Sequence, residues 1–585
     1  MSLRWTLRAH DAHLVERIEK NSSVSPVVAQ ILALRGISHP DQVASFLDLK
    51  MTGLRQPEEL PGVKEAVEKI YQAVVQKRKI FIYGDYDADG MTATAILVLC
   101  LQNFNADVSY FVPNRLDDGY GLNRDALTKL KKRGAELIVT VDCGIASVDE
   151  VEFARQLGLE IVVTDHHQMG QALPAADAII HPALPQHDYP FHGLCGAGVA
   201  FKLAWALCKK HCGSPKLPEH LRNFLFSAVS LAAIGTVCDV VPLLDENRIL
   251  VHHGLNCMRQ FCSPGLKNLM VLAKCYDKPK LSSADIGFSI GPRLNASGRL
   301  GQAQLGVELL ICQSEDRAQA LAEYIDQLNK NRDSLDRKIL RSAKKLIEEN
   351  HRPDEEPALV IAAEDWHLGV IGIVAGRIAE AFHRPTVLIS TDSLGNRPGV
   401  GSCRSSCGVD IYRALSNSSN HLIKFGGHRA AAGLTIQPEN IDAFREDFCE
   451  QVMNQVSLDE LIPDLNIDAE APIGLLTIGM MRELEKLEPF GEDNPRPILC
   501  ASGVQLAEPV KTMGTEGRHL ALQLKQHNAR IRAVAFGKGD WLKDLKDSDQ
   551  LFDFAFEPMI NDFRGRQSVE LKLIDFRPST SHKPR

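Results

Sequence analysis

Short apolar runs alternate with segments of helical spacing from residue 79 onward. Each run is rich in Val and Ile and is bounded by polar residues or glycine, as buried strands are. Strands that alternate with helices are typical of a parallel sheet covered on both faces, so the chain is predicted to be an α/β protein with a doubly wound parallel sheet. The predicted strands are 80–83, 108–112, 136–141 and 159–164, and the helix after the first of them is 91–101.

The rest of the chain divides into segments with different patterns. A helical N-terminal extension is predicted from helical spacing interrupted by prolines. A run without glycine or proline predicts one connecting helix that spans roughly 55 Å. A second, smaller α/β pattern follows, and the chain ends in alternating strands that suggest a closed β-barrel, with the oligonucleotide-binding (OB) fold as the leading candidate. The predicted boundaries are 1–70 for the extension, 71–314 for the first α/β domain, 315–351 for the connecting helix, 352–460 for the second α/β domain and 461–585 for the barrel domain.

Composition narrows the class of protein. The chain has 585 residues, more than the ~250–300 at which one hydrophobic core stops growing. Membrane contact is not expected, because no stretch reaches the ~18 uninterrupted apolar residues of a membrane span. The N-terminus has no apolar signal region, and the fourteen cysteines have no regular paired spacing, so we expect a cytoplasmic protein with reduced thiols. The formal charge of −8 means that nucleic acid could bind only through a local basic groove.

The densest chemical signal is the segment YGDYDADGMT, residues 83–92, which places Asp85, Asp87 and Asp89 between a buried strand and a helix. Carboxylates at this spacing repel one another unless cations compensate their charge. Asp and Gly are also ordinary turn residues, but a turn needs only one or two of them. The segment therefore predicts a cation site.

Further acids and histidines follow the next two predicted strands. Asp142 ends one strand, and Asp165, His166 and His167 end the other. Taken alone, each could be a turn or cap residue. Because the carboxyl ends of parallel strands meet in one crevice, we expect these side chains to converge. Asp239 interrupts a long apolar segment, where a carboxylate needs a cation or hydrogen bonds.

The donor types indicate the metal and the reaction. Carboxylate oxygens mixed with imidazole nitrogens suit Mn²⁺ or Mg²⁺ better than structural zinc, and no C-x-x-C pair is present. Two divalent cations close together would polarise a phosphodiester, so phosphoester hydrolysis is the predicted reaction class. No Walker motif or G-x-G-x-x-G turn occurs, which argues against an NTP-driven motor and against dinucleotide-dependent redox chemistry.

Phosphate-binding residues are predicted in the second α/β segment and near the first site. In GSCRSS, Ser402 offers a hydroxyl and Arg404 a guanidinium fork, a grouping suited to a terminal phosphate. The alternative is a tight glycine turn with a surface arginine. Arg115 and Arg293 each follow a proline and could also bind substrate, although either could instead form a structural salt bridge.

Four segments, GDYDADG, VDCG, TDHH and GTVCDVVPL, resemble the motifs of the DHH phosphoesterase superfamily. The segment GPRLNASGRL, residues 291–300, resembles the signature of its bacterial single-strand-specific exonucleases. FGGHRAAAG, residues 425–433, resembles the glycine motif of the DHH-associated (DHHA1) domain, and LEPFGEDNPRP, residues 487–497, resembles the entry to an OB domain. The resemblance covers nearly the whole chain.

The resemblance implies a 5′→3′ exonuclease that degrades single-stranded DNA to mononucleotides with Mn²⁺ or Mg²⁺, in recombination, DNA repair and mismatch repair. It also implies a monomer with single-strand-binding protein and a RecQ-type helicase as partners. His167 is then expected to face the scissile phosphate as a catalytic residue with Asp142 and His166, and Asp165 to orient its neighbours. The implied metal ligands are Asp85, Asp87, Asp89, Asp142, His166 and Asp239, and the implied substrate-binding residues are Arg115, Arg293, Ser402, Arg404, Gly426, Gly427 and His428.

Two other functions are compatible with the motifs. A small-molecule DHH phosphodiesterase would share the acids but would need neither a barrel domain nor a long connecting helix. A catalytically inactive DNA-binding scaffold should have lost acids from the motifs, and none is missing here. The barrel itself is expected to hold single-stranded DNA, with Trp541 in a probable loop available for base stacking; docking of a protein is the alternative.

Overall fold

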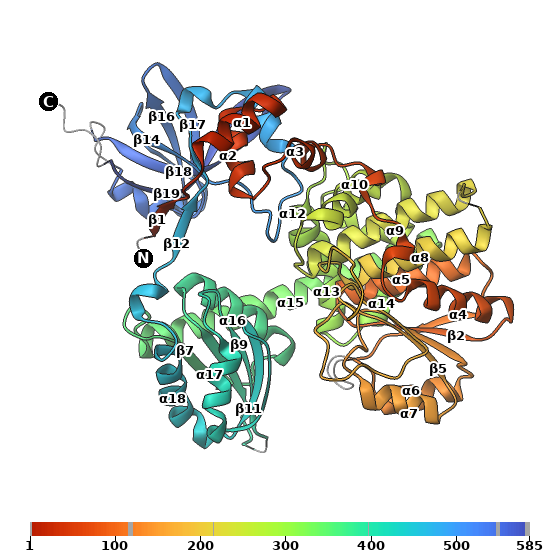
Figure 1. The fold of residues 1–585 in the computed structure, drawn as a ribbon. Coiled ribbons are helices and arrows are strands. Elements are labelled where there is room, and N and C mark those ends of the chain that lie inside the picture. The colour runs from red at the N-terminus through yellow and green to blue at the C-terminus, as the bar shows by residue number, and fades with distance from the viewer. Residues whose placement is uncertain (1–2, 115–120, 215, 396, 546–549, 580–585) are drawn as a thin grey trace. The chain divides into compact units, whose positions relative to one another are not determined.

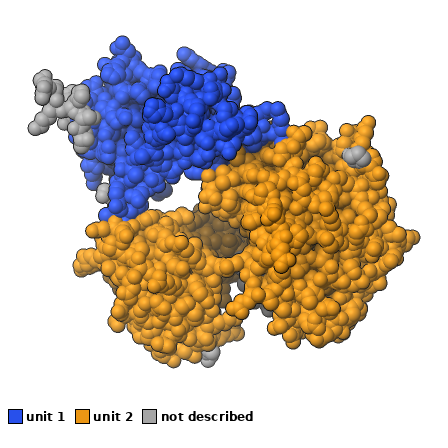
Figure 2. Space-filling model, viewed as in Figure 1, with its two compact units in different colours: residues 1–50, 462–490, 494–585 blue, residues 51–461, 491–493 orange. Residues whose placement is uncertain are grey.

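The computed structural model describes residues 3–114, 121–214, 216–395, 397–545 and 550–579. The chain forms two compact units, which Figure 2 shows in different colours. We call them the central unit, residues 51–461 with 491–493, and the terminal unit, which joins residues 1–50 to 462–490 and 494–585. The predicted extension, residues 1–70, is therefore divided between the two units.

The central unit begins with a five-stranded, wholly parallel sheet in the order β3-β2-β4-β5-β6 (Figure 1). Helices α6 and α7 cover one face, while α4, α5 and α8 lie on the other. The predicted doubly wound sheet is confirmed. Its elements are α4 Val63–Val75, β2 Ile80–Tyr83, α5 Ala88–Gln102, β3 Val108–Phe111, α6 Arg124–Lys132, β4 Leu137–Thr140, α7 Val148–Gln156, β5 Glu160–Thr164, β6 Ala178–Ile180 and α8 Gly196–Cys212.

A layer of helices follows the sheet. One of them, α9, is long and apolar enough to cross a membrane by length and composition, but 61% of its most apolar window is buried against other helices, as in the core helix of a folded domain. Helix α13 is preceded directly by a π-helical turn, η3. The elements are α9 Glu219–Cys238, α10 Asp245–Phe261, α11 Pro264–Leu272, α12 Ser283–Asp285, η3 Ile286–Ile290, α13 Gly291–Arg299 and α14 Ala303–Ile311.

The predicted connecting helix is α15, Glu315–Asn350. Its 36 residues correspond to about 54 Å at 1.5 Å per residue. The first half packs against α11 and α13, and the second half contributes Ile339, Ala343 and Ile347 to the core of the second α/β domain. One helix thus supports both parts of the central unit.

The second α/β domain has a five-stranded mixed sheet in the order β10-β11-β9-β8-β7. The glycine-rich segments 399–408 and 425–433 supply strand residues, because sheet pairing needs only backbone groups. Ser402 pairs with Gly433, and Gly433 pairs with Gly426, so this row carries little side-chain bulk. The elements are β7 Leu359–Glu364, α16 Leu368–Phe382, β8 Thr386–Thr391, β9 Gly399–Arg404, α17 Ile411–Asn417, β10 Leu422–Gly427, β11 Ala431–Ile436 and α18 Ile441–Met453.

The terminal unit contains the predicted barrel. Seven strands pair in the order β13-β14-β18-β19-β17-β16-β15, and a further pairing of β14 with β16 closes the sheet into a ring. Phe552, Phe554 and Phe556 are buried in its core. Trp541, in the short 3-10 helix Gly539–Lys543, is partly buried against this core with its ring 4.9 Å from that of Phe576, and its use for base stacking stays a prediction. The strands are β12 Asp464–Ile467, β13 Ala469–Glu470, β14 Leu499–Leu506, β15 Lys511–Met513, β16 His519–Gln526, β17 Ala529–Ala535, β18 Phe552–Phe563 and β19 Arg566–Pro578.

The N-terminal residues pack against the barrel rather than forming a separate extension. The first strand pairs in parallel with β12, and Ile18, Val28 and Leu32 join the hydrophobic core of the barrel. These contacts connect residues more than four hundred positions apart, so local spacing could not reveal them. The elements are β1 Arg4–Leu7, α1 Ala12–Ser22, α2 Pro26–Leu34, α3 Pro40–Leu47 and, before the barrel, α19 Ile478–Glu485.

Candidate active site

The loops at the carboxyl ends of β2, β4 and β5 bring the predicted acids together. Asp239, at the C-terminus of α9, joins them from the helical layer. The chain passes from β2 to β3 on one side of β2 and then crosses to β4 on the other side, so the crevice at the carboxyl end of β2 is the topological switch point where α/β proteins bind ligands. Three groups have ligand atoms within 4.8 Å of one another: Asp85, Asp87 and Asp142; Asp89, His166 and Asp239; and Asp142, His166 and His167.

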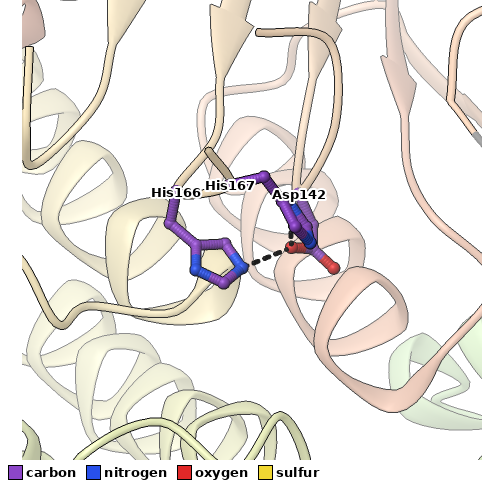
Figure 3. A group of neighbouring side chains, drawn as sticks. All are labelled: Asp142, His166 and His167. Carbon is purple, nitrogen blue, oxygen red and sulfur yellow. Dashed lines mark hydrogen bonds and ion pairs between the residues drawn. The ribbon is translucent and has the colours of Figure 1, made fainter. Parts of the chain in front are cut away.

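Asp142 belongs to two of these groups. Its φ of 61° lies in the left-handed region, which Asp tolerates better than most residues, and its backbone N–H donates to the carbonyl oxygen of Thr164. The buried carboxylate has Oδ1 3.0 Å from Nε2 of His166 and 3.8 Å from Nδ1 of His167. Figure 3 shows both histidines beside this carboxylate. Asp142 is therefore placed to serve more than one cation.

Asp165 makes a different set of contacts. Its Oδ1 lies 2.8 Å from Nδ1 of His167 and accepts hydrogen bonds from the backbone N–H groups of His166 and His167, while Oδ2 accepts one from Ile145. Burial alone would raise its pKa, but the hydrogen bond and charge of His167 and the backbone donors lower it to about 2. Asp165 is thus a charged acceptor that fixes both histidines.

Asp87 and Asp89 also hold the surrounding backbone. Asp87 is the N-cap of α5 and accepts from the N–H of Gly90 at 3.0 Å. Asp89 accepts from the first two N–H groups of α8, Gly196 at 2.6 Å and Ala197 at 2.9 Å. The positive end of the α8 dipole therefore faces the acid cluster. Both Asp89 oxygens already accept a hydrogen bond, which uses part of their capacity to bind a cation.

Glycines let the elements approach the acids closely. A Cβ atom at Gly196 would lie 2.6 Å from Cβ of Asp142, and one at Gly235 of α9 would lie 2.2 Å from Oδ1 of Asp89. Real Cβ atoms do not approach other atoms that closely. The N-terminus of α8 and the last turns of α9 can therefore meet the carboxylates only because both positions lack side chains.

The charge of the cluster is unfavourable unless cations balance it. Burial and the neighbouring carboxylates raise the pKa of Asp142 well above its usual range and that of Asp239 to about 8. Burial likewise raises the pKa of Asp87. Burial lowers the pKa of His166 to about 4, so its imidazole is neutral at pH 7 and keeps a lone pair for a cation.

The donor set fits hard or borderline divalent cations. Carboxylate oxygens with imidazole nitrogen suit Mn²⁺ and Mg²⁺. Two thiols lie close to the acids, but loss of solvent raises the pKa of both Cys195 and Cys238, so they stay protonated and are poor ligands for soft metals. The residues present therefore fit a two-cation hydrolytic centre.

Comparison with known proteins places the chain in a family. The DHH family N-terminal domain matches residues 79–232, the DHHA1 domain 355–454 and the RecJ OB domain 467–575. The single-stranded-DNA-specific exonuclease RecJ of Escherichia coli is 35% identical over 96% of this chain and 97% of its own length. That of Bacillus subtilis is 36% identical over 98% of this chain and 70% of its own. The chain belongs to the RecJ family.

Solved RecJ structures support the same assignment. The crystal structure of Thermus thermophilus RecJ in complex with Mn²⁺ has a TM-score of 0.83 and 31% identity, covering 99% of this chain and 80% of that one. A second structure of the same protein, in complex with Mg²⁺, has a TM-score of 0.75 and 30% identity over 99% and 79% of the two chains. The predicted fold class, including the DHH, DHHA1 and OB domains, is confirmed.

In this RecJ family member the signature helix α13 supports the acid loop, a role that the sequence pattern did not reveal. Asn295 Oδ1 accepts from the N–H of Ala88 at 2.8 Å, and a Cβ at Gly298 would lie 2.0 Å from the carbonyl oxygen of Tyr86. These residues press α13 against the loop that carries Asp87. The spacing of Asn295 and Gly298 on one helix face was the signal that could have indicated a packing surface.

The predicted substrate-binding arginines have different environments. The side chain of Arg293 is 18% exposed, and it donates from Nε to Asp326 of α15 at 2.8 Å and from Nη1 to the carbonyl oxygen of Ser289 at 2.7 Å. The structure thus shows the structural salt bridge that the sequence left open. Arg115 lies outside the described residues.

The phosphate-binding pair in the second α/β domain lies against the second turn of α16, at Gly372. Arg404 Nη1 donates to Ser402 Oγ at 3.1 Å and to the carbonyl oxygen of Cys403 at 2.7 Å. A Cβ at Gly372 of α16 would lie 2.9 Å from Arg404 Nη2 and 3.0 Å from Ser402 Oγ. The guanidinium and the hydroxyl therefore form one polar group suited to an anion.

The remaining predicted substrate residues lie at the turn between β10 and β11. Gly426, Gly427 and His428 are exposed, and Gly427 has a φ of 143° with almost no room for a Cβ. The backbone N–H of His428 donates to the carbonyl oxygen of Ala431 at 2.8 Å, which closes the turn. The three residues form one exposed hairpin end, and the structure does not bring them into the acid cluster.

The electrostatics predict how the stability of the metal-free protein depends on pH. Asp239 has a folded pKa of about 8 against about 4 unfolded. Burial alone would lower the pKa of His167, but Asp165 raises it to about 9. Between pH 6.5 and 8 the folded state therefore holds protons that the unfolded state has released, so stability should fall as pH rises, by about 1.4 kcal/mol per pH unit for one such proton.

Thermal unfolding in EDTA and in excess Mn²⁺ measures this effect. We expect Tm in EDTA to fall from pH 6.5 to 8, and the Tm increase caused by Mn²⁺ to grow over the same range, because cation binding needs deprotonated ligands. Below pH 6.5 His166 has the opposite effect, because its lowered pKa leaves the folded imidazole neutral while the unfolded one binds a proton. The fall in stability is therefore expected only between pH 6.5 and 8. A metal-free Tm that rises between pH 6.5 and 8 would contradict the raised pKa values of Asp239 and His167.

Proposed function

We propose that this RecJ family member is a metal-dependent, single-stranded-DNA-specific 5′→3′ exonuclease that releases 5′-mononucleotides in DNA recombination and repair, including mismatch repair. The observation that carries the proposal is the cluster of acids and histidines at the switch point of the sheet. Relatives that align over nearly the whole chain are named single-stranded-DNA-specific exonucleases, which supports the substrate class.

The proposed ligands for two cations, Mn²⁺ or Mg²⁺, are Asp85, Asp87, Asp89, Asp142, His166 and Asp239. Two bound cations would supply Lewis-acid chemistry, polarising the phosphodiester and lowering the pKa of water. Asp142 is the proposed bridge, because it belongs to two groups of ligand atoms. Protonated His167 can donate to a phosphate oxygen while Asp165 keeps its ring oriented.

The proposed site for the 5′-terminal phosphate is the group formed by Ser402 and Arg404 beside Gly372 of α16. Arg299 of α13 donates to the carbonyl oxygen of Gly369 in the first turn of α16 at 3.4 Å, so the helix that carries Gly372 adjoins the helix that supports the acids. The row of Ser402, Gly433 and Gly426 leaves space above the sheet for a polynucleotide backbone, with the hairpin at Gly427 and His428 as its proposed continuation.

The other domains are assigned supporting roles. The proposed functional segments keep the predicted boundaries, 71–314, 315–351, 352–460 and 461–585. The barrel is proposed to hold the DNA strand through Arg530 and Arg532, which are exposed on β17. We further propose a cytoplasmic monomer that works with single-strand-binding protein and a RecQ-type helicase. The fourteen cysteines are all free thiols, which is compatible with a reducing compartment.

Product analysis tests the function. Oligonucleotides labelled at the 5′ or the 3′ end, single- or double-stranded, are incubated with Mn²⁺, Mg²⁺ or EDTA. We expect immediate release of 5′-label as mononucleotide from single strands only, a 3′-label that shortens progressively, and no products in EDTA. Release of mononucleotide from the 3′ end would refute the polarity. Activity confined to dinucleotides would favour a small-molecule phosphodiesterase.

Arg404→Ala tests the phosphate site. A guanidinium on a dianionic phosphate contributes about 1.5–3 kcal/mol, so the preference for 5′-phosphorylated over 5′-hydroxyl strands should fall roughly ten- to a hundredfold. General affinity for single strands should change much less. The measurement is the ratio of kcat/KM on the two substrates, with Arg413→Ala on exposed α17 as the control. An unchanged ratio would remove Arg404 from this role.

A further inference from the structure

The turn before the signature helix exposes an aromatic ring. Phe288 lies in the π-helical turn η3 and is 84% exposed, although Ile286 and Ile290 on either side are fully buried. Burial of both neighbours fixes the backbone, so the ring is held outward by a rigid support. π-helical turns are rare and occur frequently at functional sites. An exposed aromatic side chain on such a turn needs an explanation beyond folding.

The location of η3 connects Phe288 to the acid cluster. A Cβ at Gly287 would lie 3.6 Å from Val237, and one at Gly291 would lie 2.4 Å from Sγ of Cys238, so both residues pack against the last turn of α9. Asp239 is the next residue along the chain and caps that helix. Phe288 therefore lies between the two glycines that pack against the end of α9 where Asp239 is found.

Helical spacing gives the side on which Phe288 lies. Positions 288, 292, 295 and 299 follow one another at intervals of four, three and four, which is one stripe along the helix. On that stripe Asn295 binds the acid loop through Ala88, and Arg299 binds the first turn of α16 through Gly369. The stripe thus follows the edge of the acid cluster toward the proposed phosphate site, and Phe288 begins it.

We propose that Phe288 stacks on a nucleobase of the strand whose phosphate lies at the acid cluster. The inference rests on the proposed function and deepens it by assigning a base-contacting residue. Stacking on a phenyl ring is possible for every base, so it suits an enzyme that must advance along any sequence. The Phe288 ring also offers an apolar contact beside the cluster, whereas the acids and His166 can bind only cations and phosphate.

A neighbouring residue supports an apolar subsite. Val240, which follows Asp239, is 63% exposed and has a φ of 60°, a conformation that is strained for a β-branched residue. A strained backbone conformation persists only where the neighbouring structure holds it, and such residues cluster at functional sites. Two exposed apolar side chains, on the η3 turn and directly after Asp239, therefore flank the metal-binding end of α9. A nucleobase is the apolar part of the substrate that must lie beside a phosphate held there.

The test combines variants of Phe288 with single-stranded oligonucleotides that carry one abasic site at successive positions from the 5′ end. With Mn²⁺, Phe288→Ala should lower kcat/KM on the intact strand roughly five- to a hundredfold, mainly through KM. On the strand that lacks the stacked base, the same variant should change kcat/KM less than twofold. Phe288→Trp should keep near-normal values, and Phe288→Leu should show most of the loss.

Controls separate the possible failures. Val75→Ala removes a similarly exposed apolar group, 64% exposed, at the end of α4 and so near the amino ends of the strands, opposite the acids. It should leave hydrolysis unchanged. Equal losses on intact and abasic strands, or no loss on either, would overturn the role of Phe288 while wild-type hydrolysis still stands. Absence of wild-type hydrolysis would instead refute the proposed function.

Discussion

Asp142→Ala is expected to abolish hydrolysis while leaving the protein folded. The carboxylate is central to the cluster, with Oδ1 3.0 Å from His166 and 3.8 Å from His167. Loss of the proposed bridging ligand should remove stabilisation of several kcal/mol from the transition state, so kcat with Mn²⁺ should fall about a thousandfold or more. Removal also relieves desolvation and repulsion, because burial and the neighbouring acids raise the pKa of Asp142 in the metal-free protein.

Two measurements check this prediction. The first is kcat on single-stranded DNA at saturating Mn²⁺, with Asp149→Ala as a control at an exposed position of α7. The second is Tm in EDTA and in Mn²⁺. The variant should be at least as stable as the wild type in EDTA and should gain less from Mn²⁺. Near-normal turnover would refute the bridging role, and a large loss of Tm in EDTA would show that Asp142 is needed for folding.

The sequence predicted the acid cluster because parallel strands end at a common edge. Asp87 and Asp142 are far apart along the chain, yet each follows a buried strand, so the sheet alone brings them together. Asp239 was predicted from the cost of a buried carboxylate, although it reaches the site from a helix. Local pattern and a topological rule were sufficient for these residues.

Other features depend on contacts that no local pattern encodes. Asp89 binds the first turn of α8, more than a hundred residues away, and Arg293 binds Asp326 of α15. The same arginine could equally have faced a substrate, because its sequence neighbourhood gives only a proline and a helix. The place of Trp541 in a probable loop predicts a ring available for stacking, whereas the structure packs part of that ring against Phe576 from the last strand. In each case a long-range partner determined the role.

Gly196→Ala should strongly reduce hydrolysis, because it displaces the first turn of α8 or the carboxylate of Asp142 that lies against it. The added Cβ would lie 2.6 Å from Cβ and 2.7 Å from Oδ1 of Asp142, so either the carboxylate or the first turn of α8 must move. Movement of the turn would also lengthen the 2.6 Å hydrogen bond from the Gly196 N–H to Asp89. A displacement of about 1 Å at a reacting centre costs roughly a hundredfold in rate, and overpacking of a buried contact costs about 1–3 kcal/mol of stability.

Gly198→Ala is the matched control, because it makes the same change in the same helix. Its Cβ would lie 3.3 Å from Leu194 Cδ2, a flexible side chain that can shift slightly, and alanine is a better helix former than glycine. We therefore expect Gly198→Ala to keep kcat within a few-fold of the wild type, whereas Gly196→Ala loses about two orders of magnitude and some Tm. The decisive quantity is kcat at saturating Mn²⁺ for the two variants side by side. Equal activity would mean that the N-terminus of α8 does not fix the carboxylates, and the close approach of Gly196 to Asp142 would then have no catalytic consequence.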